Sequence, residues 1–320
     1  MGKLVEGIWR DEGYGTEKTN GRFVRWESRF RDFVTPDGQS GFKAEAGRYH
    51  LYLSHACPWA HRTLIFRKLK KLEDIISVSF VEPLMAERGW TFGPGGDSLF
   101  DVDNLYEIYL KADPSCSSRV TVPVLWDKQN ATIVNNESAE IIRMLNSAFD
   151  EFGDASLDYY PQGLRGEIDT VNDDVYQRVN NGVYRTGFAT TQEAYEEAFD
   201  GLFDCLASLE QRLSTRRYLV GAQVTEADWR LFTTLLRFDS VYVGHFKCNL
   251  RRIVDYPNLW GYLRDLYQFP GIAETINMEQ IKRHYYASHA MINPTGIVPK
   301  GPEIDFTTAH GREKLTGATR

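Results

Sequence analysis

Residues 49–72 read YHLYLSHACPWAHRTLIFRKLKKL, and this stretch decides the fold of the first half of the chain. Its first six residues are mostly apolar and aromatic, which predicts a strand over 49–54. From Pro58 onward the pattern is helical, with one apolar face formed by Ala60, Leu64, Ile65, Leu69 and Leu72. Pro58 suits a first helical turn, where its missing N–H is not needed. The stretch therefore predicts a strand that leads directly into a helix, with Cys57 at the junction.

The alternation of strands and helices continues after this stretch. Further strands are expected at 75–81, 120–126 and 132–135, and further helices at 104–112 and 138–149. The segment 82–104 has no periodicity and several glycines, so we expect a long functional loop there. This order of elements predicts a thioredoxin-like α/β domain over residues 45–150.

The second half of the chain predicts helices only. After an acidic linker over 150–163, helical patterns recur at 164–182, 192–214, 225–244, 256–267 and 271–286. One buried stripe is expected from Leu202, Leu206, Leu209 and Leu213, and Thr225 with Asp228 suits a helix start. We therefore expect a helical domain over 164–286. Residues 1–44 are expected to form an extension with little regular structure, and 287–320 an irregular tail.

Composition excludes several classes of protein. The 320 residues carry 37 Lys and Arg against 44 Asp and Glu, and this net charge of −7 argues against a nucleic-acid binder. No apolar run approaches the ~20 residues of a membrane helix, and the N-terminus has no signal-peptide core. The 4 cysteines are scattered, which fits a reducing cytoplasm.

Cys57 is the candidate reactive thiol. Backbone N–H groups and the dipole at a helix start stabilise a thiolate, so we expect its pKa to fall below ~8.5. Residue 60 is Ala, so no second cysteine stands at the C-x-x-C spacing, and an external thiol such as glutathione has to complete any disulfide cycle. Two other readings stay open: a buried inert thiol, and a metal site with His55 and His61. No further ligand joins these residues, so we expect no metal.

Two further segments suit a peptide-like thiol ligand. Pro123 after Val122 indicates either an edge strand or bulge, or a cis peptide bond that exposes the Val122 backbone to an extended ligand. Ser138 suits the N-cap of the next helix. Alternatively, its hydroxyl and the helix N–H groups hold a carboxylate while Glu137 pairs with an amino group. The γ-glutamyl end of glutathione carries both groups.

These motifs resemble those of the cysteine-type glutathione transferases, and most closely the Xi class, the glutathionyl-hydroquinone reductases. The resemblance covers nearly the whole chain. Its most specific segments are CPWAHR at 57–62 and HYYASHAMINPTG at 284–296, supported by GWTF at 89–92, RVTVP at 119–123 and NNES at 135–138. It implies a thioredoxin-like domain followed by the all-helical glutathione-transferase domain, and a homodimer held through the helical domain.

The resemblance also implies an oxidoreductase reaction and its residues. Cys57 attacks the sulfur of a glutathionyl-hydroquinone, releases the hydroquinone and keeps glutathione as a mixed disulfide, which a second glutathione resolves. Glutathione, a co-substrate, is expected to contact Trp90, Arg119, Val120, Thr121, Val122, Glu137 and Ser138. The hydroquinone pocket is expected to be lined by Tyr184, Tyr242 and Tyr285, whose phenols can supply a proton or a hydrogen bond.

Two alternatives remain at this stage. An omega-like glutathione transferase with dehydroascorbate reductase or thiol transferase activity would share Cys57 and the glutathione contacts but would not need the three tyrosines. The second alternative is a glutathione-transferase-like interaction module without activity, although an intact Cys57 at a helix start argues against it.

Overall fold

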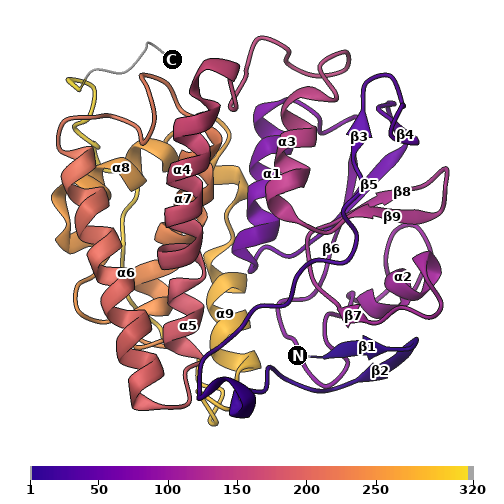
Figure 1. Ribbon diagram of the computed structural model, residues 1–320, viewed down its shortest axis with the longest axis horizontal. Helices are drawn as coiled ribbons and strands as arrows, with labels where there is room; N and C mark the ends of the chain where they lie inside the picture. The colour runs from indigo at the N-terminus through magenta and orange to yellow at the C-terminus, as the bar shows by residue number, and fades with distance from the viewer. Residues whose placement is uncertain (1, 316–320) are drawn as a thin grey trace. The chain divides into compact units, whose positions relative to one another are not determined.

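The computed structural model describes residues 2–315, which form two compact units (Figure 1). The first unit contains residues 2–14, 25–158 and 277–288, and the second contains residues 15–24, 159–276 and 289–315. The last five positions of the expected tail lie outside the described residues. Residues 277–286, which we expected in the helical domain, group with the first unit. His284 of this segment lies within hydrogen-bond distance of the Pro83 carbonyl, and the Met85 N–H donates to Ser288 just beyond it.

The core of the first unit is a mixed four-stranded sheet in the order β6-β5-β8-β9. Its strands are β5 (Tyr49–Leu53), β6 (Ser77–Phe80), β8 (Val124–Asp127) and β9 (Thr132–Asn135). β6 runs parallel to β5, whereas β8 is antiparallel to both β5 and β9. Pro123 lies just before β8 and not inside a strand as expected, because proline cannot donate to a sheet ladder.

Three helices cover this sheet as in thioredoxin-like domains. α1 (Pro58–Leu69) and α3 (Ser138–Ser147) pack side by side on one face, and α2 (Leu105–Ala112) lies on the other face (Figure 1). α1 ends before the expected Leu72, because Lys71 adopts a left-handed backbone with φ 54°. Leu72 is nevertheless fully buried. The predicted thioredoxin-like fold is confirmed.

The N-terminal extension has more regular structure than we expected. β1 (Lys3–Val5) and β2 (Ile8–Arg10) form a hairpin, and β1 also pairs with β7 (Ser118–Arg119). β3 (Val34–Thr35) and β4 (Phe42–Lys43) form a second short pair. Glu6 and Gly7 both have positive φ, as the tight turns of hairpins require. Strands of two or three residues are too short to leave a periodic pattern, which is why sequence analysis missed them.

The second unit is helical, as predicted. Its α-helices are α4 (Arg165–Val175), α5 (Gly182–Gly187), α6 (Gln192–Leu213), α7 (Glu226–Arg237) and α8 (Pro257–Tyr267). The expected stripe on α6 is buried, and the capping box of Thr225 and Asp228 at the start of α7 is present. Short 3-10 helices are η1 (Glu17–Thr19), η2 (Gln162–Leu164), η5 (Ile253–Asp255) and η6 (Ala273–Thr275).

Two predicted helices differ from the structure in the same way. The helices expected over 164–182 and 225–244 are interrupted by π-helical segments, η3 (Tyr176–Asn180) and η4 (Phe238–Tyr242). The bonds from Asn181 N to the Tyr176 carbonyl and from Val243 N to the Phe238 carbonyl span five residues. The last predicted helix is α9 (Met278–Ser288), which begins seven residues after the expected position because Ala273–Thr275 is a separate turn.

The tail from 289 to 315 has no helix or strand among its described residues, yet it is held in place. The Phe306 ring stacks on Tyr267 at 5.0 Å and contacts Trp260 at 5.7 Å. Arg312 is 3% exposed and donates to the carbonyl groups of Leu213 and Arg217 at the end of α6. A few buried side chains thus attach an otherwise largely exposed tail to the second unit.

Candidate active site

Cys57 is the N-cap of α1. It follows β5 and precedes Pro58, the first residue of the helix, and its thiol makes no capping bond with the helix backbone. Its Sγ lies 3.5 Å from the carbonyl oxygen of Val122, within reach of a weak S–H donor. The Val122–Pro123 peptide bond is cis, which confirms that alternative. The thiol and the backbone that we expected to meet glutathione are thus neighbours.

The other cysteines lie in surroundings that disfavour a thiolate. Cys57 is partly exposed, whereas Cys116, Cys205 and Cys248 are buried. Burial raises the pKa of Cys116 and Cys248, and it raises the pKa of Cys205 to about 12. Because the thiolate is the reactive form, Cys57 is the cysteine best placed to react.

A buried phenol joins two parts of the expected glutathione site. The Tyr109 hydroxyl donates to the Thr121 carbonyl at 2.8 Å and accepts from the Asn136 amide at 3.1 Å. The Thr121 N–H lies 3.1 Å from the same hydroxyl oxygen. Tyr109 is fully buried, and burial raises its pKa, so the phenol stays protonated. Segment 119–122 and the start of α3 are therefore held in one fixed relation, with Val120 buried between Arg119 and Thr121.

The start of α3 differs in one detail from our expectation. The N-cap is Glu137, not Ser138, and the Glu137 carboxylate accepts from Ala139 N at 3.1 Å and from the Ser28 hydroxyl at 3.0 Å. A carboxylate accepts several N–H groups at a helix start as readily as a hydroxyl does, which explains the exchange. Ser138 is the first residue of the helix and is 2% exposed.

Arg62 contacts two residues of the candidate site, and sequence analysis did not single it out. It is 1% exposed, and its guanidinium donates to the Ser138 hydroxyl at 3.4 Å and lies 4.5 Å from the centroid of the Trp59 ring. It therefore connects the helix that begins at Cys57 with the helix that begins at Ser138. An arginine among apolar helix positions usually faces solvent, so nothing in the local pattern indicated this role.

Trp90 and Arg119 make their strongest contacts elsewhere in the first unit. The Trp90 indole is 5% exposed and stacks on His284 of α9. The Arg119 guanidinium donates to the carbonyl groups of Glu12 and Gly13 and lies 4.3 Å from the Tyr14 ring centroid. The Arg119 side chain thus binds the N-terminal segment, and only its backbone belongs to the segment next to Cys57.

The three predicted tyrosines fall in different units. Tyr184 on α5 and Tyr242 at the end of η4 belong to the second unit, where their ring centroids are 6.2 Å apart. Phe246 lies 5.5 Å from both rings and stacks parallel to Tyr242. Tyr285 on α9 belongs to the first unit and is 1% exposed. Tyr184 and Tyr242 therefore share an aromatic cluster, while Tyr285 shares a unit with Cys57.

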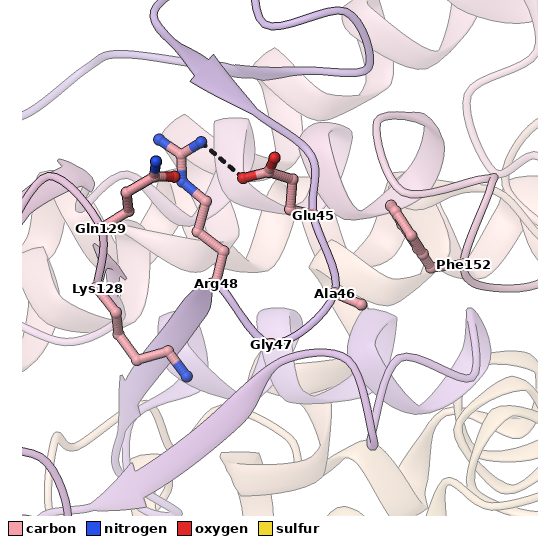
Figure 2. Close-up of a pocket in the computed structure, with 7 residues that line it drawn as sticks. All are labelled: Glu45, Ala46, Gly47, Arg48, Lys128, Gln129 and Phe152. Atoms are coloured by element: carbon pink, nitrogen blue, oxygen red, sulfur yellow. Dashed lines mark hydrogen bonds and ion pairs between the residues drawn. The ribbon is translucent and has the colours of Figure 1, made fainter.

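A separate pocket lies at the other end of β5. It has a volume of about 640 Å³ and lies between residues 45–48, Lys128, Gln129 and Phe152 (Figure 2). Its arginine, Arg48, is paired with Glu45 and Asp127. Because Arg48 precedes β5 and Cys57 follows it, this pocket does not belong to the Cys57 site.

Among residues 2–315, no helix has both the length and the apolar character needed to cross a bilayer. No group of three or more His, Cys, Asp or Glu side chains in the same residues is arranged to hold a metal ion.

Comparison with known proteins agrees with this geometry. The family model of the glutathione S-transferase N-terminal domain matches residues 56–148, and that of the C-terminal domain matches 192–265. The chain is 58% identical to glutathionyl-hydroquinone reductase YqjG of Escherichia coli, over 99% of this chain and 100% of the relative. It is 57% identical to glutathionyl-hydroquinone reductase PcpF of Sphingobium chlorophenolicum, over 94% and 96% of the two chains.

Solved structures give the same result. The glutathione-bound structure of the Escherichia coli protein aligns with a TM-score of 0.90 at 56% identity, covering 98% of this chain and 99% of the other. The Xi-class glutathione transferase of Natrialba magadii aligns with a TM-score of 0.92 at 51% identity, covering 99% and 98%. Fold and site thus define a cysteine-type glutathione transferase. Within that class, the chain belongs to the Xi family, the glutathionyl-hydroquinone reductases.

Proposed function

We propose that this protein reduces glutathionyl-hydroquinones to hydroquinones at the expense of glutathione. The observation that carries the proposal is Cys57, a partly exposed thiol at a helix start beside the Val122 backbone. Relatives at 58% and 57% identity over nearly the whole chain are named for this activity. The more distant omega-like relatives do not favour the dehydroascorbate alternative over it.

The first step forms a sulfur–sulfur bond. The Cys57 thiolate attacks the sulfur of the aryl thioether, and the carbon–sulfur bond breaks as the new bond forms. The bonding electron pair goes to the ring carbon, which takes up one proton and becomes the C–H of the hydroquinone. The Cys57 sulfur is thereby oxidised to a mixed disulfide with glutathione.

The second step restores the thiol. A second glutathione, as its thiolate, attacks the glutathione sulfur of the mixed disulfide. Glutathione disulfide leaves, and Cys57 returns to the thiolate form. This step replaces one sulfur–sulfur bond by another and protonates no carbon. Only the first step therefore needs a proton donor for the ring carbon.

Glutathione binding follows from the first unit in this proposal. The backbone of Val120, Thr121 and Val122 pairs with the peptide, Glu137 and Ser138 hold its γ-glutamyl end, and Trp90 covers it. Arg119 contributes through its backbone, since its guanidinium holds Glu12 and Gly13. Support comes from the Tyr109 and Arg62 contacts, which hold these segments together.

The phenols supply the proton and the substrate hydrogen bonds in this proposal. Tyr184 donates the proton to the ring carbon. Tyr242 and Tyr285 bind the hydroquinone hydroxyls or stabilise the Cys57 thiolate. The aromatic cluster of Tyr184, Tyr242 and Phe246 provides flat apolar walls, which suit an aromatic ring.

The test uses glutathionyl-menadiol with the parent enzyme and two matched variants. Cys57→Ser should lose menadiol release entirely, and Cys116→Ser should keep it, since Cys116 is a buried thiol outside the site. Mass spectrometry of the oxidised parent should find one glutathione on Cys57. Activity retained in Cys57→Ser would refute the proposal, and turnover of dehydroascorbate without menadiol release would favour the omega-like alternative.

We also propose a homodimer in the cytoplasm. The family resemblance motivates the dimer, which is expected to form through residues 164–286. Aromatic side chains of this region such as Trp229, Phe232 and Tyr262 are buried within the second unit, so they offer no apolar surface to a partner. Light scattering at micromolar concentration should give twice the mass of one chain, and a monomer mass would contradict the dimer.

A further inference from the structure

A histidine of α9 makes two different contacts with the loop after β6. The His284 ring lies nearly parallel to the Trp90 indole, with ring centroids 4.8 Å apart and an angle of 18° between the planes. Its Nδ1 lies 2.8 Å from the Pro83 carbonyl oxygen. Because a carbonyl only accepts, Nδ1 carries the proton in this contact. The His284 imidazole therefore contacts the loop twice: its face stacks on Trp90, and its Nδ1 bonds to the Pro83 carbonyl.

A second bond supports the same attachment. The Met85 N–H donates to the Ser288 hydroxyl at 2.9 Å, and Ser288 lies one helical turn after His284, on the same face of α9. The backbone of Trp90 is fixed separately, since its carbonyl accepts from Leu105 N at 2.9 Å at the start of α2. What remains to be fixed at Trp90 is the orientation of the indole, and the His284 ring provides that contact.

The same short segment also places the third tyrosine. Tyr285 follows His284, so its side chain leaves α9 in a different direction, and the two ring centroids are 5.1 Å apart at 75°. His284 is 7% exposed and Tyr285 is 1% exposed. Of these two adjacent residues of α9, His284 contacts the loop of Trp90, and Tyr285 is the tyrosine expected to line the hydroquinone pocket.

We propose that His284 is a positioning residue of the glutathione site. Its imidazole holds the Trp90 indole in the orientation that meets glutathione, and it ties that orientation to the helix that carries Tyr285. The inference rests on the proposed function, in which Trp90 contacts glutathione. In this proposal His284 acts through Trp90 and takes no part in the reaction at sulfur.

Three variants separate the two contacts of His284. His284→Asn keeps an N–H donor near Nδ1 but removes the ring. His284→Phe keeps a flat ring but removes the donor. Arg283→Ala changes the preceding, exposed residue of the same helix and serves as the matched control. Should the Asn variant fail to fold, His284→Leu replaces it, because leucine fills space without a flat ring.

Glutathione affinity is measured by calorimetry in full-length protein carrying Cys57→Ser, so that no turnover occurs. His284→Asn should weaken binding about 3- to 10-fold, the range that the loss of a stacked aromatic pair corresponds to. His284→Phe should stay within about 2-fold of the parent, and Arg283→Ala should not change the affinity. In the enzyme with Cys57 intact, His284→Asn should raise KM for glutathione by the same factor and leave kcat within about 2-fold.

A double-mutant cycle tests whether the effect passes through Trp90. In the Trp90→Ala background, His284→Asn should cause no further loss of glutathione affinity. The same loss in both backgrounds, or no loss in either, would overturn the inference. Unchanged binding in Trp90→Ala would overturn both the inference and the proposed glutathione contact. The double-mutant cycle could behave as expected while the parent enzyme releases no hydroquinone. That result would overturn the proposed reaction and leave the role of His284 standing.

Discussion

His50 is a buried imidazole on the central strand β5, and its ionisation couples stability to pH. Its side chain is 0% exposed, Nδ1 lies 2.8 Å from the Ser77 hydroxyl, and Nε2 has no hydrogen-bond partner among the described residues. Burial, with a smaller contribution from the Lys128 charge, lowers the pKa of His50 from 6.5 to about 4. The fold therefore favours the neutral ring over the charged ring.

Stability should fall on acidification through this group. Because the folded pKa of His50 lies below the unfolded value, the stabilisation is complete above pH 6.5 and is lost as pH falls toward 4. The loss between pH 7 and pH 4.5 should be about 2–3 kcal/mol from this residue. Urea unfolding of the parent and of His50→Gln at both pH values measures it, and the variant should show a shallower dependence. Equal pH dependence in the two proteins would exclude His50 as the cause.

At the scale of elements, the start of α3 carries both a helix cap and a proposed glutathione contact. Glu137 caps the helix through Ala139 N and also accepts from Ser28, while it is the proposed partner of the glutathione amino group. Removing a helix cap costs about 1 kcal/mol of folding free energy, and removing a charged hydrogen bond to a ligand costs about 1.5–3 kcal/mol of binding free energy.

Glu137→Ala should therefore weaken glutathione binding more than it destabilises the fold. The expected loss of affinity is about 10- to 100-fold by calorimetry, with a drop in unfolding free energy of about 1 kcal/mol. Glu137→Gln keeps an acceptor for Ala139 N without the charge, so it should retain stability and still bind glutathione weakly. Full affinity in the Gln variant would place the γ-glutamyl contact elsewhere.

The two π-helical segments lie next to the predicted tyrosines of the second unit. η3 ends two residues before α5, which carries Tyr184, and η4 ends at Tyr242. Single π-helical turns occur often at functional sites, because the extra residue rotates the side chains that follow it. Asn180 holds η3 to α7 through the Arg230 carbonyl at 3.1 Å and the Thr234 hydroxyl at 2.8 Å.

Tyr184→Phe tests the role of one hydroxyl while keeping the ring contacts with Tyr242 and Phe246. Loss of a positioned general acid costs about 10²–10⁴-fold in rate. The variant should slow menadiol release by such a factor and leave the attack of glutathione on the mixed disulfide unchanged, because only the first step protonates carbon. Single-turnover kinetics resolves the two steps. Equal slowing of both, or of neither, would assign Tyr184 to packing.

The sequence predicted the elements that have strong periodicity and missed those set by tertiary contacts. The strand over 49–54, the helix from Pro58 and the stripe on α6 follow from local patterns, and the structure confirms them. Cys57 at the N-cap and Thr225 in its capping box are local features too. The β1–β2 hairpin, the buried Arg62 and the stack of His284 on Trp90 depend on partners far away in sequence, and no local pattern encodes such partners.

At the scale of the whole molecule, the tail from 289 to 315 stabilises the second unit. Gln268 donates to the carbonyl groups of Phe306 and Thr308, and Arg264 donates to that of Ala309. Arg312 lies beyond them and accounts for four carbonyl contacts, on Leu213, Arg216, Arg217 and Asn258. The Leu213 carbonyl lies at the end of α6, where the last helical carbonyls lack helical partners, and the Arg216 and Arg217 carbonyls lie in the segment that follows.

Arg312→Ala should therefore destabilise the protein strongly. The loss of buried charged hydrogen bonds, with carbonyl groups left without a donor, should lower the unfolding free energy by about 2–4 kcal/mol. Glu303→Ala, an exposed position of the same tail, is the control and should stay within about 0.5 kcal/mol of the parent. Chemical unfolding followed by circular dichroism measures both, and equal stabilities would show that the tail contributes little.

The way the chain divides between its units has a consequence for its synthesis. The first unit consists of residues 2–14 and 25–158 together with residues 277–288, which bring His284 to Trp90. At translation rates of ~5–20 residues per second, the 118 residues from 159 to 276 keep the ribosome occupied for roughly 6–24 s. Throughout that interval the nascent unit lacks the helix that covers its indole. The unit that carries Cys57 is thus begun first, and its last helix is made only after most of the second unit has been translated.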